Sequence, residues 1–340
     1  MSAQLAMQPE EFRTMFRALQ KELATVIVGQ QDVVETLLVV CFAGGHILLE
    51  GVPGLGKTLL AKSVAKALGV EFRRIQCTPD LMPADILGTQ LVVDRAGHKA
   101  FEFAKGPVFT NILLADEINR ATPKTQSALL EAMEERQVSI AGSTHQLDEP
   151  FFVIATQNPI EQTGTYALPE AQLDRFLFRV LVDYPSEEEL SRILQRTTVA
   201  EVPSARQVLP ADQAKTWILH ARQLVREVLV AHPIEDYIVK LITATRPNLS
   251  EQREGPDNGR GSAATRWVRY GASPRGAQAI LMGAKVLALV RGRVNVSFED
   301  VDAVAIHALN HRLVLSFEAE AERRNAWDIA RELIEPIHAS

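Results

Sequence analysis

One stretch of the sequence combines glycines, a lysine and a threonine at a spacing that suits phosphate binding: Gly51-Val52-Pro53-Gly54-Leu55-Gly56-Lys57-Thr58. Glycines allow the backbone N–H groups of such a loop to turn inward and hold phosphate oxygens, and a helix beginning here adds partial positive charge. Lys57 would then reach the β- and γ-phosphates, and the Thr58 hydroxyl would bind Mg²⁺. The stretch therefore predicts a site for ATP and Mg²⁺.

The flanking residues supply the context that such a loop needs. An apolar run, 46–49, predicts a strand before it, and residues up to Leu68 predict a helix after it. The alternative interpretation is a plain glycine turn between strand and helix, with an incidental lysine. The strand and the helix together favour the phosphate site.

Two acids close a second apolar run. Residues 111–115 predict a buried strand, and Asp116 and Glu117 follow it directly. Asp116 can hold Mg²⁺ together with Thr58, while Glu117 can orient and polarise the attacking water as a general base. Two acids that merely cap the next helix are the alternative, which the nearby phosphate loop disfavours.

A polar side chain, Asn158, follows a third apolar run at 151–156. It is suited to hold the attacking water or to sense the γ-phosphate, although an asparagine before Pro159 could also simply form a turn. Ligands of parallel sheets bind at the carboxyl ends of the strands. We therefore expect Asn158, the acid pair and the phosphate loop to meet at one edge.

The elements that must position these residues alternate between strand and helix as far as about residue 182, which predicts a parallel, five-stranded sheet covered on both faces. Beyond Pro185 helical periodicity dominates, and we expect a smaller all-α domain with these helices: 186–197, 211–230, 235–247, 275–291, 298–314 and 317–336. We place the α/β domain at residues 1–190 and the helical domain at 191–340.

Several segments interrupt this alternation. An amphipathic helix is expected at 9–26, before the first strand, and β-hairpins are expected at 89–104 and 138–147. The polar, glycine-rich stretch 247–264 predicts a mobile loop in the helical domain. Both hairpins could also be ordinary decoration at the edge of the fold.

Composition limits the possible classes of protein. The chain has 36 Lys and Arg against 42 Asp and Glu, a net charge of −6, which argues against an extended nucleic-acid surface. No apolar run is long enough to cross a bilayer, and the N-terminus lacks the features of a signal peptide, so we expect a cytoplasmic protein. Cys41 and Cys77 are expected to be reduced core residues, since their spacing fits neither a disulfide framework nor a metal pair.

Taken in order, five motifs resemble the MoxR family of AAA+ ATPases over about residues 20 to 315: the phosphate loop, Leu-Leu-Ala-Asp-Glu-Ile-Asn-Arg, Ala-Thr-Gln-Asn-Pro, Leu-Pro-Glu-Ala-Gln-Leu-Asp-Arg-Phe and Gly-Ala-Ser-Pro-Arg-Gly. The resemblance implies a P-loop AAA+ αβα core with a helical lid, assembled as a ring, usually a hexamer. The hairpins match the helix-two and pre-sensor insertions of this branch.

The resemblance also assigns roles to single residues. It makes Asn158 sensor one, Arg175 the finger that reaches a neighbouring subunit's nucleotide, and Arg275 sensor two of the lid. Val28 would line the adenine pocket, although plain core packing is an equal interpretation there. Gly276 departs from the family, since many relatives have alanine at this position.

The expected function is that of a ring ATPase that remodels or activates a protein client. MoxR-like proteins often work with von Willebrand factor A proteins, and we expect such a partner to be a separate chain. One alternative is a nucleic-acid or chelatase motor subunit of the same branch, whose hairpins would carry more positive charge. Another is a nucleotide-gated scaffold that hydrolyses ATP slowly or not at all.

Overall fold

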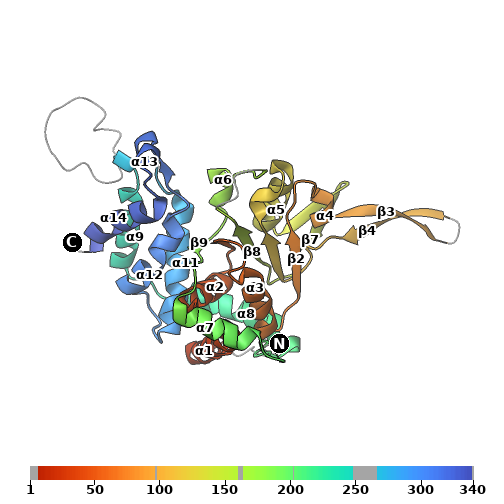
Figure 1. The fold of residues 1–340 in the computed structure, drawn as a ribbon, viewed down its shortest axis with the longest axis horizontal. Helices are drawn as coiled ribbons and strands as arrows, with labels where there is room; N and C mark the ends of the chain where they lie inside the picture. The colour runs from red at the N-terminus through yellow and green to blue at the C-terminus, as the bar shows by residue number, and fades with distance from the viewer. Residues whose placement is uncertain (1–6, 96–97, 160–163, 202, 248–265, 339–340) are drawn as a thin grey trace. The chain divides into compact units, whose positions relative to one another are not determined.

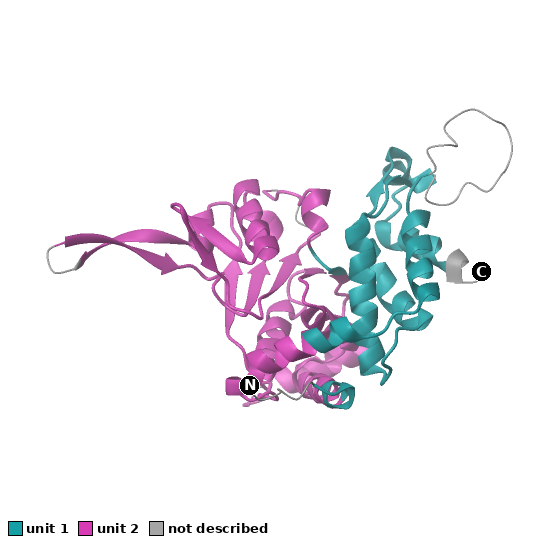
Figure 2. Cartoon of the chain, turned by 180° about the vertical axis from the view of Figure 1, so that it is seen from behind, with its two compact units in different colours: residues 1–13, 176–179, 223–340 teal, residues 14–175, 180–222 magenta. Residues whose placement is uncertain are grey.

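The computed structural model describes residues 7–95, 98–159, 164–201, 203–247 and 266–338 (Figure 1). The chain forms two compact units, which Figure 2 distinguishes by colour. Unit 2 contains residues 14–175 and 180–222, and unit 1 contains residues 1–13, 176–179 and 223–340. These units group residues by contact, so the predicted division into domains at residue 190 remains a prediction.

A five-stranded sheet has the strand order β2-β5-β8-β1-β9. Its strands are β1 (Ile47–Glu50), β2 (Phe72–Gln76), β5 (Ile112–Asp116), β8 (Phe152–Gln157) and β9 (Phe178–Leu181). The pairs β2–β5, β5–β8 and β8–β1 are parallel. Every residue of β1 and β5 is buried, as expected of strands covered on both faces. The predicted α/β class and its five-stranded sheet are confirmed.

This strand order determines where the predicted site residues lie. β5, β8 and β1 are neighbours, and the acid pair, Asn158 and the phosphate loop follow directly after them. The carboxyl ends of parallel strands share one edge of a sheet. The predicted residues are therefore brought to the same edge.

The helices up to residue 227 are α1 (Pro9–Val26), α2 (Gln31–Ala43), α3 (Lys57–Leu68), α4 (Pro83–Leu87), α5 (Pro123–Glu135), α6 (Glu170–Leu173), α7 (Glu187–Thr197) and α8 (Ala211–Glu227), with a 3₁₀ turn at Ile118–Arg120. Of these, α1, α3, α7 and α8 were predicted, and each lies close to its predicted residues. The predicted apolar face of α1 is fully buried at Phe12, Phe16, Leu19 and Leu23. Helix α3 packs against β2 and β5, so the phosphate loop at its start is tied to the sheet.

Both predicted hairpins are present in unit 2. The first pairs β3 (Gly88–Arg95) with β4 (His98–Lys105), and the second pairs β6 (Gln137–Ile140) with β7 (Ser143–Gln146). The first forms a long ribbon that extends away from the rest of unit 2 (Figure 2). At its base, the Phe103 ring stacks on the His145 ring of the second hairpin, with centroids 4.0 Å apart.

The ribbon exposes apolar side chains. Val92 lies directly opposite Phe101 across the two strands, and the two residues are 58% and 74% exposed. A cross-strand pair of this kind normally packs against a core. The ribbon therefore presents an apolar surface that the rest of the described chain does not cover.

The second hairpin is anchored to helices at its base. Glu149, which follows β7, forms ion pairs with Arg136, next to β6, and with Arg222 of α8. Arg222 is buried and also donates from Nε to the Cys41 carbonyl at 3.0 Å. A buried guanidinium needs such partners, so this network holds α2, α8 and the base of the hairpin together.

Unit 1 is mainly helical, as predicted for the lid, with α9 (His232–Ala244), α11 (Pro274–Val290), α12 (Phe298–Leu309), α13 (Phe317–Ala321) and α14 (Ala326–His338). The prediction of one helix over 317–336 was wrong. Arg323 has a left-handed backbone, and the Asn325 side chain caps a new helix by accepting the Asp328 N–H at 2.9 Å.

The lid contains a two-stranded antiparallel sheet that the sequence analysis did not predict. It pairs β10 (Val268–Tyr270) with β11 (Val314–Leu315), so the helix expected over 298–314 ends earlier, at Leu309. Strands of two or three residues are too short to show periodicity in a sequence. The predicted loop at 247–264 lies outside the described residues except for its first residue.

Cys41 and Cys77 are free and buried, which confirms their predicted place in the core. Among the described helices, none is both long enough and apolar enough to span a membrane.

One buried histidine links three elements of unit 2. Nδ1 of His46 accepts the Val153 N–H at 3.0 Å, so its other nitrogen carries the proton and donates to the Met133 carbonyl at 3.2 Å. Burial away from water is the main reason that the pKa of His46 falls from 6.5 to about 3. The folded protein therefore keeps this imidazole neutral.

We predict that this histidine makes the fold acid-sensitive. As the pH falls below 6.5, the His46 imidazole binds a proton in the unfolded chain. In the folded protein it stays neutral until about pH 3. The free energy of unfolding should therefore decrease across this window, by up to about 1.4 kcal/mol per pH unit from this residue. Urea denaturation of His46→Gln over the same window should show a shallower slope. His232→Gln, at an exposed position, is the control, and equal slopes for wild type and His46→Gln would contradict the prediction.

Candidate functional site

The phosphate loop has the backbone that its glycines predict. Gly54 and Gly56 have φ values of +86° and +78°, in the left-handed region that favours glycine. A Cβ placed on either residue would meet nothing within 4 Å, so the space in front of the loop is open. Gly51 is needed for a different reason, because its Cβ would lie 2.7 Å from the Val182 carbonyl oxygen.

Lys57 is the first residue of α3 and is only 9% exposed. Its ammonium group donates to the carbonyls of Gly51 and Val52 at 2.5 and 2.8 Å. Burial lowers its pKa, while the nearby charges of Asp116 and Glu117 act in the opposite direction. The lysine thus lies inside the loop, where phosphate oxygens would be stronger acceptors than neutral carbonyls.

The segment predicted to line the adenine pocket is linked to the phosphate loop through one side chain. Gln30 donates from Nε2 to the Leu55 carbonyl at 3.2 Å, which connects the loop to the segment that contains Val28. Val28 is half-buried. Its predicted place beside an adenine ring stays a prediction.

The structure brings the two predicted metal ligands together. The Thr58 hydroxyl donates to Oδ2 of Asp116 at 3.3 Å, and Asp116 is 8% exposed. Both offer oxygen atoms, the ligand type that Mg²⁺ prefers. Left-handed glycines before open space, a buried lysine, a helix N-terminus and paired oxygen ligands fit a nucleotide with Mg²⁺.

Glu117 occupies an unusual backbone position, since its φ of 56° is left-handed in a residue other than glycine. Thr156 at the end of β8 supports it: its hydroxyl accepts the Glu117 N–H at 2.8 Å and donates to Oδ1 of Asp116 at 2.6 Å. Thr156 is fully buried. One hydroxyl therefore fixes both acids, and the sequence analysis missed it.

Two further residues around the acids come from β2 and were also missed. Gln76 donates from Nε2 to Glu117 at 2.9 Å, and Arg74 contacts Oδ2 of Asp116 through Nε at 3.1 Å and Nη2 at 2.7 Å. Residues two apart on a strand share a face. The sequence alone did not single them out, because their place beside the acids depends on the pairing of β2 with β5.

Asn158 lies just past β8, beside the acid pair's strand, and is 4% exposed. Its carbonyl accepts from the Asn119 side chain at 3.3 Å, which fixes the backbone there. The position fits a polar group near the γ-phosphate. Its role as sensor one stays a prediction.

The two predicted arginines lie in different units. Arg175, in unit 2, pairs with Glu134 of α5 at 2.9 Å and its side chain is 28% exposed. Arg275, in unit 1, is the second residue of α11, and its N–H bonds to the Ser273 hydroxyl at 3.1 Å. The roles of both arginines at a nucleotide remain predictions.

Gly276, where the family resemblance led us to expect alanine, has a local explanation. A Cβ at this position would lie 3.2 Å from both the Ala272 Cβ and the Arg312 Cδ. These distances are tighter than ordinary van der Waals contact, so the neighbours would have to shift. The glycine lets α11 approach these side chains closely.

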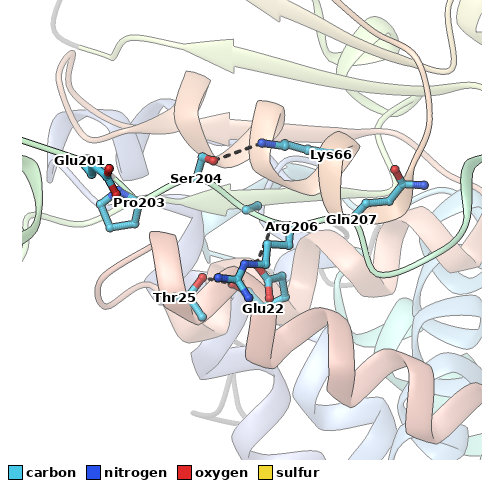
Figure 3. Close-up of a pocket in the computed structure, with 9 residues that line it drawn as sticks. Glu22, Thr25, Lys66, Glu201, Pro203, Ser204, Arg206 and Gln207 are labelled. Atoms are coloured by element: carbon cyan, nitrogen blue, oxygen red, sulfur yellow. Dashed lines mark hydrogen bonds between the residues drawn. The ribbon is translucent and has the colours of Figure 1, made fainter.

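A cavity of about 760 Å³ lies at the other end of α3 from Lys57 (Figure 3). Lys66 in the last turn of α3 bonds to the Ser204 hydroxyl at 3.2 Å, and the Arg206 N–H bonds to Glu22 at 2.6 Å. None of the predicted nucleotide residues lines this cavity. It is separate from the candidate site.

The fold and the site define a nucleotide-binding protein of the AAA class. Residues 46–178 match the model of the "ATPase family associated with various cellular activities (AAA)", and residues 260–333 match an AAA lid domain. "Chaperone MoxR1" of Mycobacterium tuberculosis is 46% identical over 327 residues, which cover 96% of this chain and 82% of the relative. The chain belongs to the MoxR family of AAA+ ATPases, as the sequence motifs indicated.

Two further similarities extend along nearly the whole chain. "Protein MoxR" of Methylorubrum extorquens is 32% identical over 348 residues, covering 97% of this chain and 96% of the relative. A solved structure of a protein from Cytophaga hutchinsonii, proposed to be an ATPase, superposes with a TM-score of 0.85 at 39% identity. It covers 96% of this chain and 95% of that one. The αβα core and the helical lid are therefore shared with these proteins.

Proposed function

We propose that this protein binds and hydrolyses Mg-ATP as a ring of identical subunits, and that hydrolysis remodels or activates a protein client. The observation that carries the proposal is the contact between the Thr58 hydroxyl and Asp116, beside Glu117 and the phosphate loop. Chaperone MoxR1 among the relatives supports a chaperone-like role. A hexameric ring and action in the cytoplasm are the proposed setting.

Each residue of the site has a distinct task in this proposal. The loop N–H groups and Lys57 bind the phosphates, while Thr58 and Asp116 hold the metal. Bound Mg²⁺ would supply positive charge to the β- and γ-phosphate oxygens. Glu117 accepts a proton from the attacking water, and Asn158 orients that water.

Glu117 must be freed before it can accept that proton. Its Oε2 atom accepts hydrogen bonds from Gln76 and from Arg120, at 2.9 and 3.1 Å. These two donors hold the carboxylate in place through one of its oxygen atoms. The described arrangement therefore fits a resting subunit.

Completion of the site requires a second subunit and the lid. We assign Arg175 to the nucleotide of a neighbouring subunit, which it reaches after leaving Glu134, and Arg275 to the γ-phosphate of its own subunit. Both would add positive charge where negative charge develops during phosphoryl transfer. ATP would then favour one arrangement of core and lid, and hydrolysis would release it.

The first hairpin is the proposed contact with the client. Val92 and Phe101 present exposed apolar area at a distance from the sheet, which is typical of a protein-binding surface. In the ribbon, Asp94 lies opposite Lys99, so the charges there are mixed rather than a basic strip. This favours a protein client over a nucleic-acid one. A separate von Willebrand factor A protein is the partner that the family resemblance implies.

We predict that binding and hydrolysis of ATP can be separated. Lys57→Ala should lose ATP binding, because it removes the charge inside the phosphate loop. Glu117→Gln should keep binding and lose turnover by about 10²-fold or more, because only water activation is removed. Binding of a fluorescent ATP analogue and phosphate release would be measured in parallel. Turnover equal to wild type in Glu117→Gln would contradict the assignment.

A further prediction concerns assembly. Turnover per subunit should rise with protein concentration, and Arg175→Ala should lower it by roughly 10³-fold, by analogy with other arginine fingers. Mixing Arg175→Ala with Lys57→Ala subunits should restore part of the turnover, because some interfaces then pair an intact loop with an intact arginine. Glu134→Gln is the matched control, since it frees Arg175 without removing it. Verified mixed rings without recovered turnover would refute action in trans.

The client surface is tested on a Glu117→Gln background, which should hold the ATP state. Val92→Ser with Phe101→Ser should keep ATP binding and assembly but lose most co-purifying client, because the apolar pair is removed. Val199→Ser is the control at another exposed apolar position in unit 2. Recovery of the same client by the hairpin variant, quantified by mass spectrometry, would show that the client binds elsewhere.

A further inference from the structure

We propose that Arg74 is a built-in counter-cation, which holds Asp116 in the resting subunit and competes with the metal ion for its carboxylate. The inference rests on the proposed function, since it assumes that Asp116 is a metal ligand. It assigns a role to a residue that neither the motifs nor the family match singled out.

Arg74 and the proposed metal ion would compete for the same oxygen of Asp116, Oδ2. Oδ1 is taken by the buried Thr156 hydroxyl at 2.6 Å. Oδ2 faces the Thr58 hydroxyl, so it is the oxygen of Asp116 that would hold a metal ion together with Thr58. Arg74 already occupies that atom with both Nε and Nη2, at 3.1 and 2.7 Å.

The Arg74 side chain can move away from Asp116 at a small cost in free energy. Its side chain is 45% exposed, whereas that of Asp116 is 11% exposed. β2 is an edge strand of the sheet, so solvent is available beside it. The carboxylate therefore stays in place when the arginine swings out, and the ion pair is weak enough for a divalent cation to replace it.

Gln76 connects Arg74 to the proposed general base, Glu117. Nη2 of Arg74 also donates to Oε1 of Gln76 at 2.5 Å, and the amide nitrogen of Gln76 donates to Glu117. When Arg74 leaves Asp116, the amide group of Gln76 loses one of the bonds that orient it. Departure of Arg74 from Asp116 would thus loosen the restraint on Glu117, and Arg74 keeps the subunit inactive for as long as it stays on Asp116.

The test measures metal affinity rather than turnover. Wild type and variants are loaded with ADP and titrated with Mn²⁺, a paramagnetic substitute for Mg²⁺, while electron paramagnetic resonance reports the free ion. Arg74→Ala should bind Mn²⁺ about two- to five-fold more tightly, the range expected from releasing one half-exposed ion pair. Arg74→Lys should give a smaller change, because its ammonium keeps the charge but cannot reproduce the two-bond contact.

Arg73→Ala is a matched control. Arg73 is the next residue of the same strand, its side chain is 43% exposed, and it pairs with Glu71 at 2.9 Å rather than with Asp116. Its removal subtracts the same charge without freeing an oxygen of Asp116, and because direct competition is the proposed effect, the Mn²⁺ affinity of the ADP-loaded protein should stay unchanged. A shift in Arg74→Ala but not in Arg73→Ala identifies direct competition instead of a general change in the field.

Two results would overturn the proposal. Weaker Mn²⁺ binding in Arg74→Ala would show that the arginine positions Asp116 for the metal, and equal shifts in Arg74→Ala and Arg73→Ala would show a field effect only. Arg74→Gln repeats the measurement if the alanine variant does not fold. Failure of wild type to bind ADP would instead refute the proposed function, so the two failures are distinguishable.

Discussion

The buried carboxylate of Asp116 is the group on which the rest of the site depends. A carboxylate taken out of water at the end of a strand needs hydrogen-bond donors, and Asp116 receives them from α3, β2 and β8. Two of these elements also carry another site residue, Lys57 on α3 and Gln76 on β2. In the sheet, β2 and β8 are the two neighbours of β5, so both can donate to the acid at its end.

Thr156 illustrates how the backbone and the chemistry are joined. Its hydroxyl bridges Asp116 to the N–H of Glu117, and this second bond holds Glu117 in a left-handed conformation that costs about 1 kcal/mol or more. Such strain persists only where the surroundings fix it. The adjacent acids can point in different directions because β8 supplies this one hydroxyl.

Sequence reasoning succeeded where a local pattern has a single physical interpretation. Left-handed glycines before Lys57 and an apolar run ending in Asp116 and Glu117 are such patterns, and the structure places these residues together. Pattern reasoning failed for Arg74, Gln76 and Thr156, because their importance depends on which strands become neighbours. Which strands become neighbours is determined by the sheet order as a whole and cannot be read from any single segment.

Sequence reasoning also missed short strands and a helix break in the lid. The short strands at Val268–Tyr270 and Val314–Leu315 are 2- or 3-residue elements stabilised by pairing between distant parts of the chain. The helix break at Arg323 and Asn325 was in principle recoverable, since asparagine is a strong helix cap. The helical periodicity on both sides concealed it.

The first hairpin carries a cost for the protein in solution. In the described residues β3 and β4 pair only with each other, so each strand has one edge that no further strand covers, next to the apolar Val92 and Phe101. Edges of this kind are templates for pairing with another chain. In a subunit whose hairpin is uncovered, this ribbon is therefore where non-productive aggregation is expected to begin.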